Sequence, residues 1–423
     1  MTAVGDTTWP PESAPSALLR LDDFRLLLAI QVFVGLRGPT LWFAQAWYVN
    51  TAAPESQRLL WLGLLASVNG AAFLGWSLFG GAIADRYPRR VTLIASHAAG
   101  AVLVSITTGL FFLPGVEEGG PWLPVVLLLF STMGLMNAQD LPARTALIAD
   151  IVPDRHLTTA VTINWLVLAV MMIAGNGLGG ALVEWLGFGT TYAVGVVGHV
   201  AVAILASQLR VRVAPGDSSA RGRSLLRNVR DGVAYVRRDR AVRWAVLLMW
   251  ISVLCGTSVL WTLGAAWMNE VLGVGPAGWS LLTALWSIGM VVSSAWLMSQ
   301  GDYRGMGPKF VAAALLYAAA VLTYSLSRSI AVTACALFFA GFAFQGQQTV
   351  GTALLQREVP RALLGRITAL LFLSQGLAQT SGLAFGLLGQ ALGLPLLFAA
   401  TGAMMLASAA AIALVQRPLR ALG

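Results

Sequence analysis

Charged residues are confined to short clusters, and the stretches between the clusters carry none. Only 11% of the chain is charged and 57% is hydrophobic, whereas a soluble domain has about 25% charged residues. Ten uncharged tracts reach, or nearly reach, the roughly 20 residues that cross a bilayer as a helix. They are residues 59–84, 91–116, 119–139, 157–183, 185–209, 244–269, 271–301, 310–327, 329–356 and 367–416.

The number of membrane spans follows from these tracts. The last tract has room for two spans with a break near residues 389–395, and residues 26–50 form a further span that only Arg37 interrupts. We therefore predict an all-α membrane protein with twelve transmembrane helices. Residues 1–19 are polar and rich in Pro and Ser, so we expect a disordered cytoplasmic tail with no cleavable signal. Residues 417–423 are expected to form a second cytoplasmic tail.

A short internal repeat divides the apolar region into two halves. The string TALIADIVP, which begins at Thr145, returns 207 residues later as TALLQREVP, which begins at Thr352. Two halves that repeat in the same direction are typical of transporters whose substrate site lies between two helical bundles. The repeat predicts two pseudo-symmetric six-helix bundles, residues 20–209 and 244–416.

The segment between the halves, residues 210–243, is predicted to be a cytoplasmic linker. Its first part is rich in Pro, Gly and Ser and suits a flexible connection. From Ser224 onward apolar residues recur at helical spacing, with arginines on the opposite face. This pattern predicts an amphipathic helix on the inner membrane surface. The apolar positions are Leu225, Leu226, Val229, Val233 and Val236.

Arginine is distributed unevenly between the loops. One set of loops holds the clusters at 86–90, 210–243 and 357–366, whereas the opposite set carries mainly glutamates, among them Glu184 and Glu270. The positive-inside rule places the basic loops and both termini in the cytoplasm. The net charge of +9 then reflects topology and contact with anionic membrane lipids. We expect no nucleic-acid partner, because the arginines form no single domain.

The loop after the second span contains the most specific motif. It has the pattern G-x-x-x-D-R-x-x-R-R and resembles the signature loop of the major facilitator superfamily, with Pro88 where a glycine is usual. The resemblance implies the fold of that family and a conformational latch that binds the other half. The latch residues are Gly81, Asp85, Arg86, Arg89 and Arg90.

The resemblance extends over roughly residues 20–416 and favours one branch of the family. Residues 140–153 with Asn164, and residues 356–367, are similar to the enterobactin-exporter-like and macrolide-efflux-like proteins. Exporters of the family often carry a glycine-rich stretch in span 5, which here includes Gly175, Gly179 and Gly180. Close helix packing explains these glycines as well as direction-specific gating does.

Charged residues inside the predicted spans are costly to bury and therefore suggest function. Arg37 lies on span 1, and Asp140 and Arg144 lie one turn apart on span 4, with Asn137 one turn further. The resemblance implies that spans 1 and 4 line the cavity, where Gln347 of span 10 stands opposite Asp140. We hypothesise that Asp140 exchanges a proton for substrate, biased by Arg144 or Arg37. A static ion pair is the alternative for Asp140, and an anchor for an anionic substrate is an alternative for Arg37.

The remaining polar and aromatic residues in the spans have simpler interpretations. Glu184 and Glu270 are expected to be solvated span ends, and His97 and His199 to be core or interfacial histidines. Cys255 and Cys335 are expected to be buried thiols, with no metal or disulfide motif. Five tryptophans in spans 1 and 7 suit either the membrane interface or an aromatic wall for a planar substrate. They are Trp42, Trp47, Trp250, Trp261 and Trp267.

These features together predict a secondary active transporter that exports a small organic molecule, siderophore or drug-like, in exchange for protons. An uncoupled facilitator, an importer or a lipid flippase on the same fold is the alternative, and a membrane enzyme or receptor is a remote one. No P-loop, metal-ligand cluster or nucleophile motif occurs in the loops. We expect a monomer without a cofactor in a bacterial cytoplasmic (inner) membrane.

Overall fold

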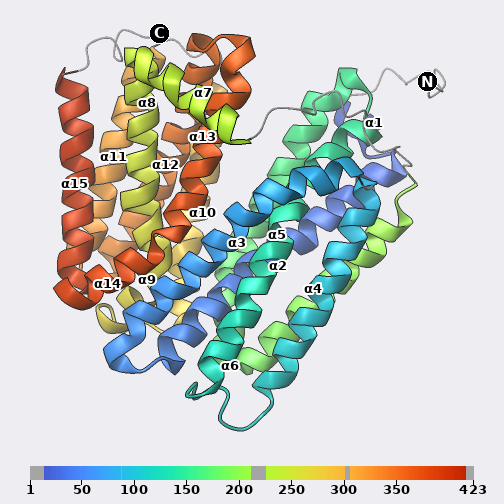
Figure 1. Ribbon diagram of the computed structural model, residues 1–423, viewed down its shortest axis with the longest axis vertical. Helices are drawn as coiled ribbons and strands as arrows, with labels where there is room; N and C mark the ends of the chain where they lie inside the picture. Colours follow the sequence, from blue (N-terminus) through green and yellow to red (C-terminus); the bar gives the residue numbers. More distant parts are fainter. Residues whose placement is uncertain (1–13, 87, 211–224, 301–304, 416–423) are drawn as a thin grey trace.

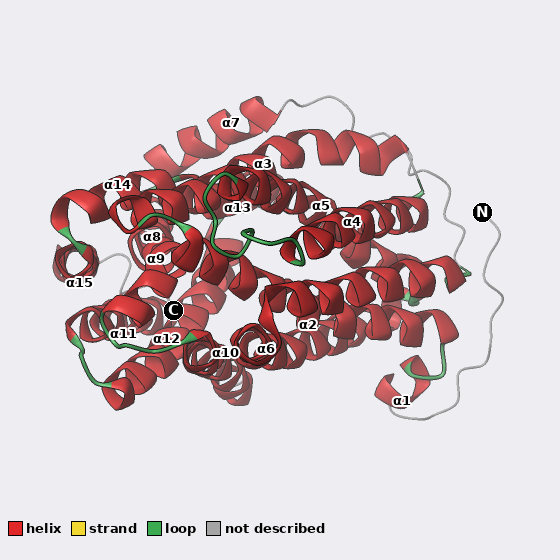
Figure 2. Cartoon of the chain, turned by 90° about the horizontal axis from the view of Figure 1, so that it is seen from below, coloured by secondary structure: helices red, strands yellow, loops and turns green. Residues whose placement is uncertain are grey.

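The computed structural model describes residues 14–86, 88–210, 225–300 and 305–415. Over these ranges the chain consists of helices joined by short loops, and no strand is present (Figure 2). The N-terminal half contains α1 (Ala14–Leu18), α2 (Asp22–Ala52), η1 (Glu55–Gln57), α3 (Arg58–Arg86), α4 (Arg89–Phe111), α5 (Trp122–Ile151), η2 (Asp154–His156) and α6 (Leu157–Gln208). After α7 (Leu225–Arg238), the C-terminal half contains α8 (Arg240–Ile251), η4 (Ser252–Thr257), α9 (Ser258–Glu270), α10 (Pro276–Ser299), α11 (Met306–Leu326), α12 (Ile330–Glu358), α13 (Arg361–Thr380), α14 (Gly382–Leu392) and α15 (Leu394–Val415).

The predicted apolar tracts fall on these helices, because a backbone in hydrocarbon must satisfy its own hydrogen bonds. Within the described ranges, nine helical segments are long and apolar enough to cross a membrane. One of them, Thr159–Gln208, contains two predicted tracts, since α6 turns at Gly187 with a φ of 77°, a backbone angle that suits glycine. The remaining tracts fall on α5 and on α13 with α14, whose apolar parts are shorter. The all-helical membrane fold is confirmed, and the count of twelve spans stays a prediction.

The two halves of the molecule meet at one end and diverge at the other (Figure 1). We call the end at which α2 begins and α15 finishes the proximal end, and the opposite end the distal end. The largest hydrophobic cluster contains side chains of both halves, such as Trp47 of α2 and Trp279 of α10. The two other clusters each belong to one half and lie toward the proximal end. Among the described residues, the core that the halves share therefore lies toward the distal end.

Polar and aromatic contacts join the halves at this distal seam. Trp42 of α2 packs edge-on against Trp261 of α9, with 4.7 Å between ring centroids, and Phe43 lies 4.5 Å from Trp279. Glu184 accepts a hydrogen bond from the backbone of Ala277 in the first turn of α10, an end of the helix that favours a carboxylate. The seam also includes the pairs Arg58–Glu270 (2.8 Å), Asn176–Ser287 (2.7 Å), Ser280–Gly177 (3.0 Å), Ser67–Thr380 (2.8 Å) and Gln390–Ser56 (3.0 Å).

Glu184 and Glu270 were expected to be solvated span ends, and the structure shows both residues exposed at the ends of their spans. Each carboxylate also binds the opposite half, a contact that was not expected. Because the contact surfaces come from segments 93 and 212 residues apart, their pairing leaves no local trace in the sequence.

The linker helix α7 packs on the proximal end of the C-terminal half. Its half-buried Val233, Tyr235 and Val236 join the hydrophobic cluster of that half, and Asp231 pairs with Arg366 of α13 at 3.2 Å. Arg237 and Arg238 remain exposed. The apolar face of α7 thus covers the C-terminal half, while its arginines are free to meet anionic lipid.

The packing at the seam predicts different responses to two alanine substitutions on α6. A Cβ on Gly180 would overlap the carbonyl of Pro276, whereas a Cβ on Gly177 would meet only Ala284 at an ordinary 3.8 Å. Gly180→Ala should therefore destabilise the closed seam by about 1–3 kcal/mol and shift its opening about 5–150-fold. The measurement is thiol labelling of Ser287→Cys from the distal side, in a background without native cysteines. Gly177→Ala is the matched control, and equal labelling of the two variants would contradict the proposed role of the seam.

Candidate functional site

A buried polar network lies inside the N-terminal half. Four helices contribute to it, and none of its seven side chains is more than 6% exposed. Its members are Gln31 and Arg37 of α2, His97 of α4, Asp140 and Arg144 of α5, and Asn164 and His199 of α6. Ionisable groups at this depth in a membrane bundle are costly unless they bind one another.

The first part of the network connects Arg37 to Asp140 through two imidazoles. Arg37 Nη1 lies 2.9 Å from His199 Nε2, and the Nδ1 atoms of His199 and His97 are 3.2 Å apart. His97 Nε2 then lies 3.1 Å from Asp140 Oδ1. Every ring nitrogen of both histidines is engaged in this path.

The second part of the network continues from Asp140 toward the proximal end. Arg144 Nε donates to Asp140 Oδ1 at 2.9 Å, and Arg144 Nη1 donates to Gln31 Oε1. Gln31 Nε2 in turn donates to Asn164 Oδ1 at 2.7 Å. The seven side chains therefore form one continuous hydrogen-bonded path.

Local sequence explains how these side chains fit into a tightly packed bundle. Asp140 and Arg144 are four residues apart, which places them on one face of α5. Gly198 leaves room for the stem of Arg37, because a Cβ there would lie 3.2 Å from Arg37 Cδ. Gly100 faces the ring of His199 in the same way, with the ring Nδ1 only 2.6 Å from the position of a Cβ. Glycines opposite the large polar groups thus provide the volume that the network occupies.

The structure brings together three of the five residues predicted for coupling. Arg37, Asp140 and Arg144 belong to one network, which is enclosed within the N-terminal half. The side chain of Asn137 lies outside the described residues. Gln347 is buried in the C-terminal half, where its amide donates to the carbonyl of Leu248 at 3.4 Å. Among the described contacts, no hydrogen bond connects Gln347 with Asp140.

Sequence reasoning missed four members of the network as site residues. His97 and His199 were expected to be satisfied core or interfacial histidines; both are buried and hydrogen-bonded, and in addition they connect Arg37 with Asp140. Gln31 and Asn164 complete the far end of the network. Their sequence separations, such as 102 residues between the histidines, give no local pattern. The available signal was that each is a polar residue within an otherwise apolar span.

The predicted latch is only partly within the described side chains. Those of Gly81, Asp85 and Arg86 lie outside the described set. Arg89 Nη1 donates to both carboxylate oxygens of Asp150 at 2.7 Å, and Arg90 Nε donates to the carbonyl of Ala206 at 3.2 Å. In this conformation Arg89 and Arg90 tie the start of α4 to the ends of α5 and α6. Contact of the latch with the other half stays a prediction, and Asp150 is a partner that the sequence did not identify.

The span-5 glycines pack α6 between two helices. A Cβ on Gly175 would lie 2.7 Å from the carbonyl of Leu36, and one on Gly179 would lie 3.0 Å from Thr40 Cα, both on α2. Gly180 faces Pro276 of α10, across the seam. Close packing of α6 therefore occurs both within its half and between halves, and a gating role stays a prediction.

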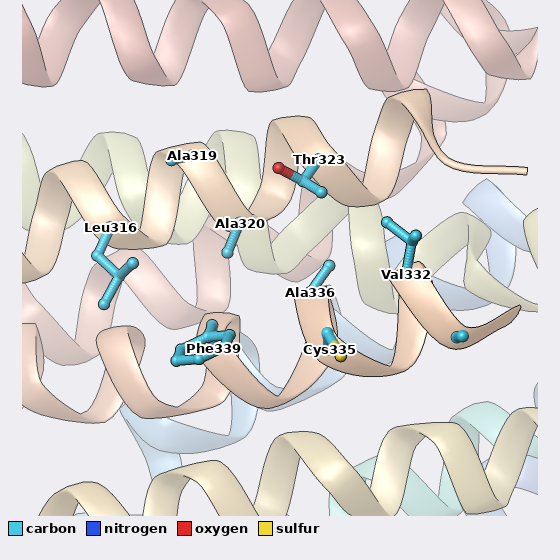
Figure 3. A pocket seen from close by; sticks show the side chains of 9 residues that line it. Leu316, Ala319, Ala320, Thr323, Val332, Cys335, Ala336 and Phe339 are labelled. Atoms are coloured by element: carbon cyan, nitrogen blue, oxygen red, sulfur yellow. The ribbon is translucent and has the colours of Figure 1, made fainter. Parts of the chain in front are cut away.

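An apolar groove of about 400 Å³ lies between α11 and α12, away from the network (Figure 3). Its lining includes Thr323, Cys335 and Phe339. Phe339 is 49% exposed, as expected for side chains that face lipid in a membrane protein. The thiol of Cys335 is also exposed, which corrects the expectation that both cysteines are buried; Cys255 is only partly so.

Within the described ranges, no group of three or more His, Cys, Asp and Glu side chains could hold a metal ion. His199, His97 and Asp140 follow one another through hydrogen bonds. That serial connection favours a hydrogen-bonded path over a coordination shell, in which all the ligands surround one ion.

An all-helical membrane protein, with two halves that meet at one end and ionisable groups buried in one of them, has the architecture of a transporter. The sequence profile of the Major Facilitator Superfamily matches residues 27–383, and the chain belongs to this family. It is therefore a membrane transporter of a small molecule and not an enzyme.

Individual relatives are distant. The chain is 19% identical over 360 residues to the Staphyloferrin A transporter of Staphylococcus aureus (strain NCTC 8325 / PS 47), a match covering 84% of this chain and 87% of the relative. It is 24% identical over 123 residues to a Na(+), Li(+), K(+)/H(+) antiporter of Planococcus maritimus, covering 28% and 27%. A mutant form of the nucleoside transporter NupG has a TM-score of 0.71 at 12% identity, covering 93% of this chain and all of that structure. The structural likeness supports the fold.

The geometry predicts that Arg144 is essential for stability. Arg144→Met would leave the Asp140 carboxylate buried without its guanidinium, and breaking a buried ion pair in this way costs about 3–5 kcal/mol. We expect a clear drop in the melting temperature of the detergent-solubilised protein, measured by scanning fluorimetry. Arg237→Met, at an exposed position of α7, is the control and should change stability by about 0.5 kcal/mol or less. Similar shifts in both variants would show that the network does not stabilise the fold.

Proposed function

We propose that this protein is a secondary active exporter that moves a small organic molecule out of the cytoplasm in exchange for protons. The proposal places the proximal end in the cytoplasm and the distal end outside, in agreement with the arginine-rich proximal loops. It also places the protein in a bacterial cytoplasmic membrane. The conformation described here, closed at the distal seam, then corresponds to the state that faces the cytoplasm.

The observation that carries this proposal is the environment of Asp140. Its carboxylate lies among membrane-spanning helices and accepts hydrogen bonds from Arg144 and His97. A buried carboxylate held by such donors stays ionised while they are in place and favours a proton when they move away. Conformational change in the N-terminal half can therefore alternately bind and release a proton at this site.

The relatives are compatible with this proposal. One relative is named as a transporter of staphyloferrin A and another as a cation/proton antiporter. We infer a substrate of the siderophore-like or drug-like class. Trp42, Trp261 and Trp279 supply aromatic surface at the seam, where such a molecule would contact both halves. Arg37 is enclosed within the network in this state, which favours a role in coupling over an anchor for an anionic substrate.

The test is proton movement in everted membrane vesicles that contain the protein. Candidate substrates are added to acidified vesicles, and proton release is compared between the parent and Asp140→Asn. We expect the parent to release protons on addition of a transported substrate, and the variant to lose this release by about 100-fold or more. The reason is that an amide cannot exchange a proton at this position.

Asp22→Asn, at an exposed position near the start of α2, is the matched control and should behave like the parent. Proton release that survives in Asp140→Asn, at equal expression, would move the coupling site elsewhere. If the parent carries a substrate without any proton response, the antiport proposal is wrong and the protein is a facilitator or flippase.

A further inference from the structure

The hydrogen-bond donors at the two ends of the histidine pair fix the tautomer of each ring. A guanidinium can only donate, so Arg37 donates to His199 Nε2, and the proton of neutral His199 is on Nδ1. His199 Nδ1 then donates to His97 Nδ1, so the proton of neutral His97 is on Nε2, where it is donated to Asp140. All three bonds are satisfied with both rings neutral and Asp140 ionised.

The path has a direction across the membrane. Arg37 is six residues nearer the distal end of α2 than Gln31, which is about 9 Å. Arg37 and His199 therefore mark the distal end of the network, and Arg144 with Gln31 marks the proximal end. His97 and Asp140 lie between these two ends.

We propose that His199 and His97 form a proton wire that delivers protons from the distal side to Asp140, with Arg37 as the gate of the wire. This inference rests on the proposed proton-coupled function and identifies the route by which the proton reaches the coupling carboxylate. The charged and titratable groups that face the wire are Arg37 from α2, and Asp140 and Arg144 from α5.

Proton delivery takes three transfers once Arg37 has moved away from His199. A hydronium ion on the distal side gives a proton to His199 Nε2 and becomes water, and the proton on His199 Nδ1 passes to His97 Nδ1. The proton on His97 Nε2 passes to Asp140 Oδ1. Three N–H or O–H bonds form, and each proton leaves the atom that held it, so Asp140 becomes neutral and both rings stay neutral with exchanged tautomers.

The tautomer of His199 that these transfers produce prevents Arg37 from binding it again. After delivery, His199 carries its proton on Nε2, which faces Arg37 Nη1 in the conformation described here. Two donors cannot share a hydrogen bond, so Arg37 cannot return to His199 while Asp140 holds the proton. The protonation of Asp140 and the position of Arg37 on α2 are thereby linked.

The sequence of α2 shows how seam opening would move the gate. Gly38 and Pro39 lie between Arg37 and the seam residues Trp42 and Phe43. Pro39 has no amide hydrogen, so the helix loses one backbone hydrogen bond at this point and bends more readily. When the seam residues separate from α9 and α10, α2 can bend at this point, and the change of backbone geometry next to Arg37 can displace its side chain from His199.

The test compares proton transfer with substrate exchange in proteoliposomes. His97→Gln and His199→Gln can keep hydrogen bonds to their neighbours, but an amide does not relay a proton. We expect both variants to lose substrate-driven proton release by about 100-fold or more. Substrate-for-substrate exchange, which needs no net proton movement, should stay within about twofold of the parent. The chain has three histidines, and His156→Gln, in η2 outside the network, is the matched control.

The outcomes separate the two proposals. If the parent shows no proton response, the antiport function itself is wrong, and the wire with it. If the parent releases protons and both glutamine variants do so equally well, the wire is wrong and the antiport function stands. Loss in the two variants but not in His156→Gln supports the wire.

Nitrogen NMR of histidine-labelled parent protein at neutral pH gives a test that does not depend on the folding of any variant. It should show one buried ring protonated on Nδ1 and one on Nε2, with His156→Gln used for assignment. Two rings of the same tautomer, or a cationic buried ring, would overturn the hydrogen-bond order on which the wire depends.

Discussion

Burial of the Asp140–Arg144 pair is the constraint on which the N-terminal half depends. Removing two charges from water costs several kcal/mol per ion, so the pair persists only with further hydrogen bonds, which His97 and Gln31 provide. Those contacts fix α2 and α4 against α5. An apolar pair of similar volume would often be as stable or more stable. The stability of the bundle therefore does not explain why ions occupy this position, and the proposed role of Asp140 in coupling would account for them.

The two halves share an architecture but not this chemistry. At the repeat offset Asp140 corresponds to Gln347, and Arg144 corresponds to Gly351. A Cβ on Gly351 would lie 2.6 Å from the ring of Phe310, so apolar packing fills the space that Arg144 occupies in the first half. The titratable groups of the network all belong to the N-terminal half. The C-terminal half contributes its side of the seam. This difference agrees with the proposal that the N-terminal half binds the proton, while the C-terminal half mainly changes its position relative to the N-terminal half.

The sequence predicts elements well here and contacts poorly. Charge-free tracts predict helices because the membrane allows few other structures, and the spacing of Asp140 and Arg144 predicts their pairing. The transmembrane helices are apolar around most of their circumference, so periodicity does not show which face is turned inward. Because the rotation of each helix about its axis could not be inferred, His97, His199 and the Arg89–Asp150 pair were not assigned as site residues. The seam contacts of Glu184 and Glu270 were missed for a related reason, since their partners belong to the opposite half.

The helix α2 connects the seam to the buried network, and its counterpart in the C-terminal half has a matching irregularity. Pro39 lies between Arg37 and Trp42 on α2. In the first span of the other half, the π-helical segment η4 ends at Thr257, four residues before Trp261, and Trp261 packs on Trp42. Both spans thus depart from regular α-helical hydrogen bonding just before the aromatic residues that join them, and such departures often mark moving parts. If the seam opens by bending at these points, the network in the first half is displaced, whereas the described residues of the second half include no buried charged side chain. A symmetric motion would then affect protonation in one half only.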